Sequence, residues 1–291
     1  MTTLRLFPEE RFPPVRVLSY GGGLDSFAML LLAIKQKQLP EVAIFADVTD
    51  PERKDPGEWP GTYSHIREVV MPICEQRGIE FVWLDTTSSP IRGHRSLMQY
   101  FESKTMMFTR MSRVCTVGAK VERIVEYLTT RYVGRDLEVS IGFEAGEEVR
   151  AKKDPHGRGR PSKEHGIRRV NVYPLMEAGM CRCACEAMVR ETGLPVPRKS
   201  ACVFCPSNSR GDWLTLKAEL PGEFRRAARL EERSKLTGQG IKLRFSGEPE
   251  VPLEEWIHRG REYKRKEIVC GVCGEIRASK AVGCDYLDED E

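Results

Sequence analysis

The residue types that bind phosphate gather in one octapeptide, Ser19-Tyr20-Gly21-Gly22-Gly23-Leu24-Asp25-Ser26. An apolar run at 15–19 precedes it and another at 27–34 follows it, which predicts a turn from a buried strand into a helix. Three consecutive glycines allow positive φ and let backbone N–H groups approach an anion closely. The start of the helix adds unpaired N–H donors and about half a positive charge. The octapeptide therefore predicts a nucleotide-phosphate site; the alternative is an ordinary glycine-rich turn.

Cysteines form the second set of residues with chemistry of their own. The chain has ten of them, a number that indicates metal or redox chemistry in a compartment where thiols stay reduced. They are the isolated Cys74 and Cys115, the alternating Cys181, Cys183 and Cys185, the C-x-x-C pairs Cys202/Cys205 and Cys270/Cys273, and Cys284. Cys74 lies in the apolar run 69–74, so we expect a packed core thiol there rather than a ligand.

The length and the charge of the chain are consistent with a soluble enzyme. The chain has 291 residues, enough for one large α/β domain or for one domain with a smaller attachment, and its net charge is +3. Charged residues make up 31%, and no apolar run approaches the length that spans a bilayer, so we expect no membrane segment. The first ten residues lack the features of a secretory signal. We therefore expect a cytoplasmic protein.

Strand-like and helix-like runs alternate along the first half of the chain. The apolar runs predict strands at 15–19, 42–47, 81–85 and 137–143, and helices at 27–34, 62–78 and 117–132, the second capped by Thr62 and ended by Gly78. This order is typical of a doubly wound parallel sheet, which binds ligands at the carboxyl ends of its strands. Asp47 ends the second strand and is expected at that edge with the glycine loop.

A basic segment follows at 150–169, where the regular alternation stops. It holds eight Lys and Arg residues against Asp154 and Glu164, with glycines and prolines between them. The composition predicts a mobile loop. We expect this loop to be either a solvated connection or a lid or groove for a polyanion, such as nucleotide phosphates or a nucleic-acid backbone.

Several motifs, in order, resemble one protein family. The glycine loop resembles the PP-loop S-G-G-x-D-S of ATP pyrophosphatases, although Gly21 stands where that family usually has serine. Further matching segments lie at 113–121, 143–150, 173–175, 193–195 and 199–206. Together they cover about residues 15–235 and resemble the phosphoadenosine phosphosulfate reductase-like branch of PP-loop proteins, particularly its phage and bacterial members. That branch also includes the sulfur-inserting enzyme of DNA phosphorothioation.

The resemblance implies a fold and a nucleotide site. The fold would be adenine nucleotide alpha-hydrolase-like, with a PP-loop domain at 1–175, a Cys-rich helical segment at 176–245 and a Cys-containing extension at 246–291. ATP or a related adenine nucleotide would bind with Mg²⁺. The expected contacts are Ser19, Gly21, Gly22, Gly23, Asp25, Ser26 and Asp47, and the expected catalytic residues are Asp25, Lys120 and Arg150.

The resemblance also implies a [4Fe–4S] cluster, held by Cys115, Cys185, Cys202 and Cys205. Zn²⁺ is the rival, bound by the two C-x-x-C pairs or by a separate knuckle from Cys270, Cys273 and Cys284 with a fourth ligand. Soft thiolate sets suit both metals, so the residues leave the choice open. Cys181 and Cys183 have no part in either arrangement.

The function that this resemblance implies is adenylation of an acceptor, followed by iron–sulfur-assisted sulfur transfer. One alternative is reduction of adenylated sulfate, but the E-C-G-x-H motif of those reductases is missing from the C-terminal residues. Another is a non-catalytic nucleotide-binding or nucleic-acid-binding component. The acceptor, a protein that donates sulfur, and the oligomeric state stay open, and a nucleic-acid acceptor would contact the segment 150–169.

Overall fold

The computed structural model describes residues 12–50, 52, 57–104, 114–154, 157, 162–164, 167–205, 208–236, 252–258 and 267–278. The strands are β1 (Val15–Ser19), β2 (Val42–Ala46), β3 (Glu80–Leu84), β4 (Leu137–Ser140), β5 (Ser162–Glu164), β6 (Ile167–Val172), β7 (Glu267–Val269) and β8 (Ile276–Ala278). The helices of the first half are α1 (Leu24–Lys35), α2 (Pro60–His65), the π-turn η1 (Ile66–Val70), α3 (Met71–Gln76), α4 (Leu97–Lys104), α5 (Val114–Thr116), the π-turn η2 (Val117–Val121) and α6 (Glu122–Arg131). Those of the second half are α7 (Glu148–Lys152), α8 (Pro174–Glu177), α9 (Arg182–Glu191), α10 (Arg210–Glu219), α11 (Pro221–Leu236) and α12 (Leu253–Trp256).

The main sheet is open and has the order β3-β2-β1-β4-β6-β5. The five neighbouring strands β3, β2, β1, β4 and β6 all run parallel. β5 pairs with β6 at the edge and runs antiparallel to it. The chain moves outward from β1 through β2 to β3 and then returns to the other side of β1 as β4. The α/β class is therefore confirmed. This reversal of direction beside β1 is the place where such sheets bind ligands, at the carboxyl ends of the strands.

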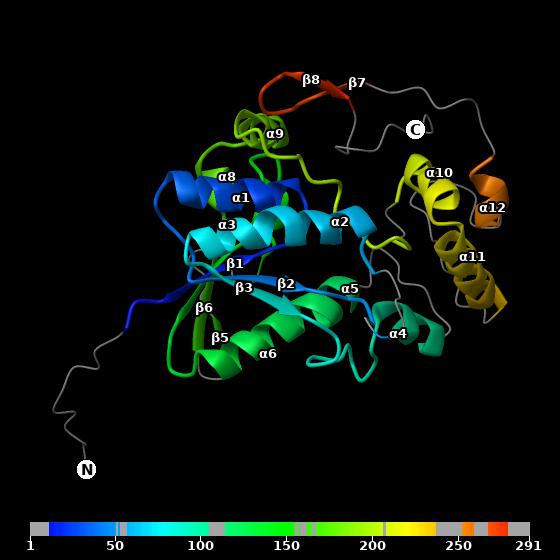
Figure 1. Cartoon of the computed structure of the whole chain (residues 1–291), viewed down its shortest axis with the longest axis horizontal. Coiled ribbons are helices and arrows are strands. Elements are labelled where there is room, and N and C mark those ends of the chain that lie inside the picture. The colour runs from blue at the N-terminus through cyan, green and yellow to red at the C-terminus, as the bar shows by residue number, and fades with distance from the viewer. Residues whose placement is uncertain are drawn as a thin grey trace, which may run out of the picture.

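Helices pack on both faces of this sheet (Figure 1). Leu18 and Phe45 point to the face covered by α1, α3 and α9, whereas Val17 and Ile44 point to the face covered by α6. Strands buried on both sides explain why β1 and β2 are continuous apolar runs in the sequence. Phe27 of α1 is fully buried, a contribution of about 2–3 kcal/mol for a side chain of that size. Within the described residues, no helix has the length and apolar character needed to span a membrane.

The predicted helix at 62–78 is present as α2, η1 and α3 in succession. Pro72 has no N–H and its ring would clash with a carbonyl of the preceding turn. The π-turn just before it widens the helix, and the N–H of Met71 donates to the carbonyl of Ile66. The predicted cap at Thr62 is wrong, because the helix begins at Pro60 with Trp59 as its N-cap residue. Gly78 ends the stretch at φ +68°, as predicted.

The prediction of a loop throughout 150–169 is wrong where the structure describes that segment. The end of α7, all of β5 and the start of β6 lie there, and β6 is the fifth parallel strand. Inward positions of β6 carry polar residues, which hides the strand pattern in the sequence. Arg169 is buried and donates from Nε to Oδ1 of Asn171 at 3.1 Å. Arg158 and Arg160 lie outside the described residues.

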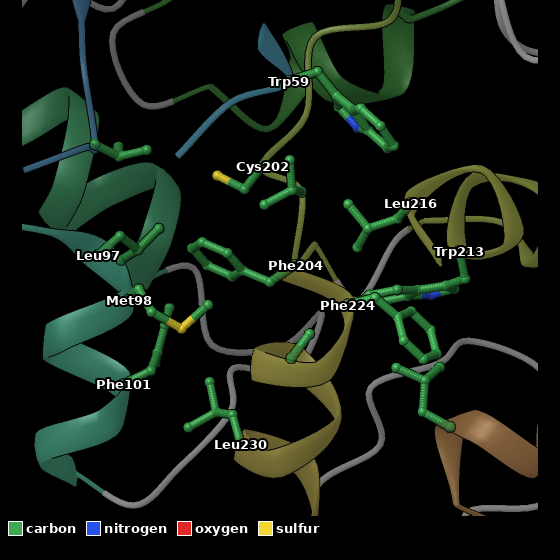
Figure 2. Close-up of a cluster of buried hydrophobic side chains, with 14 of the residues drawn as sticks. Trp59, Leu97, Met98, Phe101, Cys202, Phe204, Trp213, Leu216, Phe224 and Leu230 are labelled. Atoms are coloured by element: carbon green, nitrogen blue, oxygen red, sulfur yellow. The ribbon is translucent and has the colours of Figure 1, made fainter. Parts of the chain in front are cut away.

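A separate hydrophobic core forms beyond the carboxyl end of β2, between α4, α10, α11 and α12. Figure 2 shows Phe204 between the side chains of α4 and those of α11. The ring of Phe204 lies 6.5 Å from that of Phe101, and the Trp213 and Phe224 rings are also 6.5 Å apart. α9 packs against α1 in the sheet core instead. The predicted division of the chain into domains at 1–175, 176–245 and 246–291 stays a prediction.

His65 makes the packing of α2 depend on pH. Its ring packs edge-on against Phe27, with the ring centres 4.8 Å apart, and its Nε2 hydrogen-bonds the Pro195 carbonyl at 3.0 Å. Within the part of the chain that the structure describes, Nδ1 is buried without a partner. Burial lowers the pKa of His65 below its ordinary value of 6.5. The unfolded chain therefore takes up a proton before the folded chain does, and stability is lost as the pH falls through and below that value.

We expect the free energy of unfolding of the wild type to fall between about pH 7 and pH 5, and His65→Gln to remove part of that slope. Urea unfolding at several pH values measures it. Parallel pH profiles for the two proteins would show that His65 is not responsible.

Candidate active site

The glycine loop lies at the point where the sheet reverses direction. Gly22 has φ +79°, and a Cβ on it would lie 2.6 Å from Cγ2 of Thr62. Gly23 is extended and forms the N-cap of α1. Ser26 donates its hydroxyl to the carbonyl of Gly23 at 2.9 Å, and Ser19 ends β1 just before the loop. The loop is thus a tight turn whose shape requires glycine, followed directly by a 12-residue helix.

Asp25 has an incompletely satisfied carboxylate in the first turn of α1. Its Oδ2 accepts from Arg182 Nη1 at 3.1 Å, whereas Oδ1 is buried and has no hydrogen-bond partner among the described residues. Burial raises the pKa of Asp25; Arg182 opposes this, and Glu147 and Glu144 add to it. A buried carboxylate oxygen without a donor costs free energy unless a ligand or an ion contacts it. This is the group in the loop most clearly prepared for a ligand.

The segment after β4 closes against the same turn. A Cβ on Gly142 would lie 3.3 Å from the backbone nitrogen of Ser26, so glycine leaves room for this close approach. Glu144, two residues on, accepts from the backbone N–H of Arg182 at 3.1 Å. Arg182 is therefore held at both its backbone and its side chain beside Asp25. Sequence reasoning missed Arg182, because it lies 157 positions from Asp25 and belongs to none of the matched motifs.

A buried ion pair lies on the other side of the loop. Glu58 has no exposed surface, and its Oε1 accepts from Lys120 Nζ at 2.7 Å. Ser200 donates to Oε2 of Glu58 at 3.1 Å and also contacts the carbonyl of Gly21. Burial opposes the charge of Lys120, but Glu58 beside it raises the pKa of Lys120 above its ordinary value. The predicted anion contact Lys120 is thus paired with a carboxylate at the edge of the site.

Asp47 reaches the predicted edge of the sheet, but its carboxylate is occupied. Oδ1 accepts from the Tyr63 hydroxyl at 3.0 Å and from the N–H of Thr49 at 3.1 Å, and Oδ2 accepts from Trp83 Nε1 at 3.0 Å. Arg123 also donates to the carbonyl of Asp47. Asp47 therefore organises the chain after β2, and any nucleotide contact from it competes with these bonds.

Arg150, the third predicted catalytic residue, lies on α7 at the rim. It pairs with Glu147, and its guanidinium lies 4.4 Å from the centre of the Phe143 ring. Phe143 in turn stacks on Tyr173, with the ring centres 5.5 Å apart. Arg150 also lies near enough to lower the pKa of Asp25. The structure thus brings Arg150, Arg182 and Asp25 to one side of the glycine loop.

The four cysteines expected to hold an iron–sulfur cluster do not lie together. Cys115, Cys202 and Cys205 pack at the core of α4, α10 and α11, and Cys202 lies near Lys120 and Glu58. Cys185 is buried in the sheet core instead, near Asp25, Glu144 and Cys181. Burial raises the pKa of Cys185 to about 12. This arrangement does not fit a cluster with these four ligands.

A different set of four cysteines does come together. The sulfur atoms of Cys181, Cys183, Cys270 and Cys273 all lie within 4.8 Å of one another, a spacing that fits a metal ion. Backbone N–H groups of Cys273 and Val272 point to the thiol of Cys270 and lower its pKa to about 6. The zinc alternative that joined Cys202 and Cys205 to Cys270 and Cys273 is therefore not the arrangement found. The C-x-C spacing of Cys181 and Cys183 was the sequence feature that could have indicated these two as partners of Cys270 and Cys273. Cys284 lies outside the described residues.

Breaking the Glu58–Lys120 pair should destabilise the fold by leaving a charge without its partner. We expect Glu58→Gln to lower the free energy of unfolding by about 3 kcal/mol, the lower end for buried pairs, because Lys120 is 30% exposed. The double variant Glu58→Gln/Lys120→Met should recover most of this loss. Urea unfolding of the wild type, the two single variants and the double variant gives the coupling energy. Additive losses would mean that the two charges do not stabilise each other.

No family model matches the chain, and no curated protein matches it.

Proposed function

We propose that this chain is a PP-loop enzyme that binds ATP or a related adenine nucleotide at Gly21–Ser26 in a doubly wound, adenine nucleotide alpha-hydrolase-like fold. The observation that carries the proposal is the unpartnered Oδ1 of Asp25, next to a glycine turn at the sheet's point of reversal. Both the position and the turn are those that phosphate binding requires. The order of motifs that resembles the phosphoadenosine phosphosulfate reductase-like family supports the same assignment.

Each part of the loop has a role in holding the pyrophosphate. The extended Gly23 and the first N–H groups of α1 face the phosphates, and positive φ at Gly22 brings the backbone close. Asp25 Oδ1 would hold Mg²⁺, which would offset the negative charge of the phosphates. Arg182 and Arg150 bring positive charge to the same side. This is a site built for positioning and charge stabilisation.

The reaction we propose is adenylation. An acceptor oxygen attacks the α-phosphorus of ATP, and pyrophosphate leaves from the glycine loop. Arg182 contacts Asp25 directly and is placed to stabilise charge on the phosphates. Lys120 is committed to Glu58, so we assign it a positioning role: it fixes Glu58 and, through Ser200, the carbonyl of Gly21.

Sulfur transfer is the second step of the proposal. Cys202 and its neighbours Cys115 and Cys205 lie beside the Lys120–Glu58 pair, which contacts the loop through Ser200. A persulfide on one of these thiols, its outer sulfur transferred from a sulfur-donor protein, would attack the adenylated acceptor and displace AMP, which joins the acceptor to the cysteine through a disulfide. A second of these thiols would then attack that disulfide, release the thiolated acceptor and form a cysteine disulfide, which an external thiol reduces. Because Cys185 lies in another core, no step is assigned to an iron–sulfur cluster. The acceptor is either a nucleic acid or a small metabolite, and a pyrophosphate-release assay with each distinguishes them.

Gly22 and Gly78 provide a matched pair of substitutions. Both have positive φ, +79° and +68°, so alanine should cost about 1 kcal/mol of backbone strain at either position. At Gly22 the new Cβ would also meet Thr62 at 2.6 Å, whereas nothing lies within 4 Å at Gly78. We expect Gly22→Ala to lose binding of ATP with Mg²⁺, measured by calorimetry, and Gly78→Ala to bind as the wild type does. Equal binding by both variants would remove the glycine loop from the site.

Asp25→Asn tests the catalytic role with little change in shape. The amide can keep its contact with Arg182, but it loses the charge that would hold Mg²⁺. We expect pyrophosphate release from ATP, assayed with DNA, tRNA and small acceptors, to fall at least a hundredfold, about 3 kcal/mol of transition-state stabilisation. The control is Glu219→Gln, which removes a 54% exposed carboxylate paired with Arg198 far along the chain. Wild-type rates in the Asp25 variant would contradict the proposal.

A further inference from the structure

The cysteines of the α9 start and of the β7–β8 turn meet although they are far apart in the chain. We propose that Cys181, Cys183, Cys270 and Cys273 bind one Zn²⁺ ion, and that this ion fastens the β7–β8 hairpin to the N-terminal end of α9. Figure 1 shows the hairpin lying directly beside α9. The site is distinct from the three thiols near Lys120.

The spacing of the sulfur atoms favours a single ion. A Zn–S bond of about 2.3 Å places the four sulfurs of a tetrahedral site about 3.8 Å apart. The observed set, all within 4.8 Å, needs only a small contraction to reach that geometry. In a [4Fe–4S] cluster each thiolate bonds a different iron, so its sulfurs lie farther apart than those around one ion. Four protein ligands leave no open position, which is the mark of a structural zinc site.

The turn between β7 and β8 has the shape of a metal knuckle. Gly274 has φ +74° and donates its N–H to the carbonyl of Cys270 at 2.9 Å. Cys270 in turn donates its own N–H to the backbone carbonyl of Glu275 at 2.8 Å. The N–H groups of Val272 and Cys273 point at the Cys270 sulfur. These donors would offset part of the negative charge of a four-thiolate site.

The hairpin side chains that the structure describes, those of residues 269–275, bury little apolar surface. Of residues 269–275, Cys270 alone is buried, and Val269 and Val272 are 64% and 48% exposed. None of the three hydrophobic clusters includes any of residues 269–275. A two-stranded hairpin on its own is marginal in water. The free energy of zinc binding would therefore supply the folding energy that burial does not.

The zinc ligands also flank a residue of the glycine-loop site. Arg182 lies between Cys181 and Cys183, and its side chain contacts Asp25. An ion that fixes both neighbours fixes the start of α9 and so the direction of Arg182. The effect on nucleotide binding rests on the proposed function, whereas zinc binding itself does not.

Metal analysis of the full chain, purified without oxygen, tests the site. We expect about one zinc ion per chain, with no iron and no acid-labile sulfide. Cys270→Ser and Cys183→Ser should lose most of the zinc, and trypsin should then cut near the hairpin much faster than in the wild type. The matched controls Cys115→Ser and Cys205→Ser should keep the zinc and the protection. ATP binding, measured on the same samples, reports separately on the nucleotide site.

Three results would overturn the proposal: iron and sulfide in the wild type that depend on these four cysteines, zinc that survives Cys270→Ser, or zinc lost in the control variants. If the serine variants do not fold, cobalt substitution of the wild type decides. The visible spectrum of tetrahedral four-thiolate Co²⁺ supports the site. A spectrum with fewer sulfur ligands contradicts it.

Discussion

Glu58 brings a negative charge to a buried position, and three other parts of the chain are arranged around it. Lys120 comes from η2, Ser200 from the segment before α10, and Tyr63 from α2, where its hydroxyl accepts the N–H of Glu58 at 2.9 Å. Glu58 also bridges backbone to backbone with Cys202. A buried carboxylate is tolerated only when such partners are present. The sheet and the second core are therefore joined where the glycine loop, the lysine and the thiols meet.

The local patterns predicted the first half of the fold well. β1 and β2 were visible because strands buried on both faces are apolar throughout, and the glycine turn was visible because residues with a Cβ rarely adopt the positive φ of Gly22. β6 was not visible, since Arg169 and Asn171 occupy inward positions and pair with each other. The pattern of hydrophobicity fails where burial is achieved by hydrogen bonding rather than by apolar side chains.

The site residues likewise fall into two groups: those whose position follows from the local sequence, and those whose partners depend on tertiary structure. The position of Asp25 could be predicted from its neighbours in the sequence, because it follows the glycine turn in the first turn of α1. The engagement of Asp47 by Trp83 depends on pairing of β2 with β3, and no local pattern predicts such a partner. The cysteines show this most clearly: the family resemblance implied Cys185 as a partner for Cys202, whereas α9 turns Cys185 into the sheet core. Tertiary structure, not spacing, decides which thiols meet.

The position of β1 has a consequence for how the chain folds as it is synthesised. β1 is the first strand to be made and lies inside the sheet, with Val17 paired both to Val42 and to Val139. One edge of β1 therefore stays open until more than a hundred further residues have been added. An open edge on an apolar strand invites pairing with other chains. The nascent protein must keep that edge from pairing with other chains until β4 is made, so the sheet closes on both sides of β1 only after about residue 140 has been added.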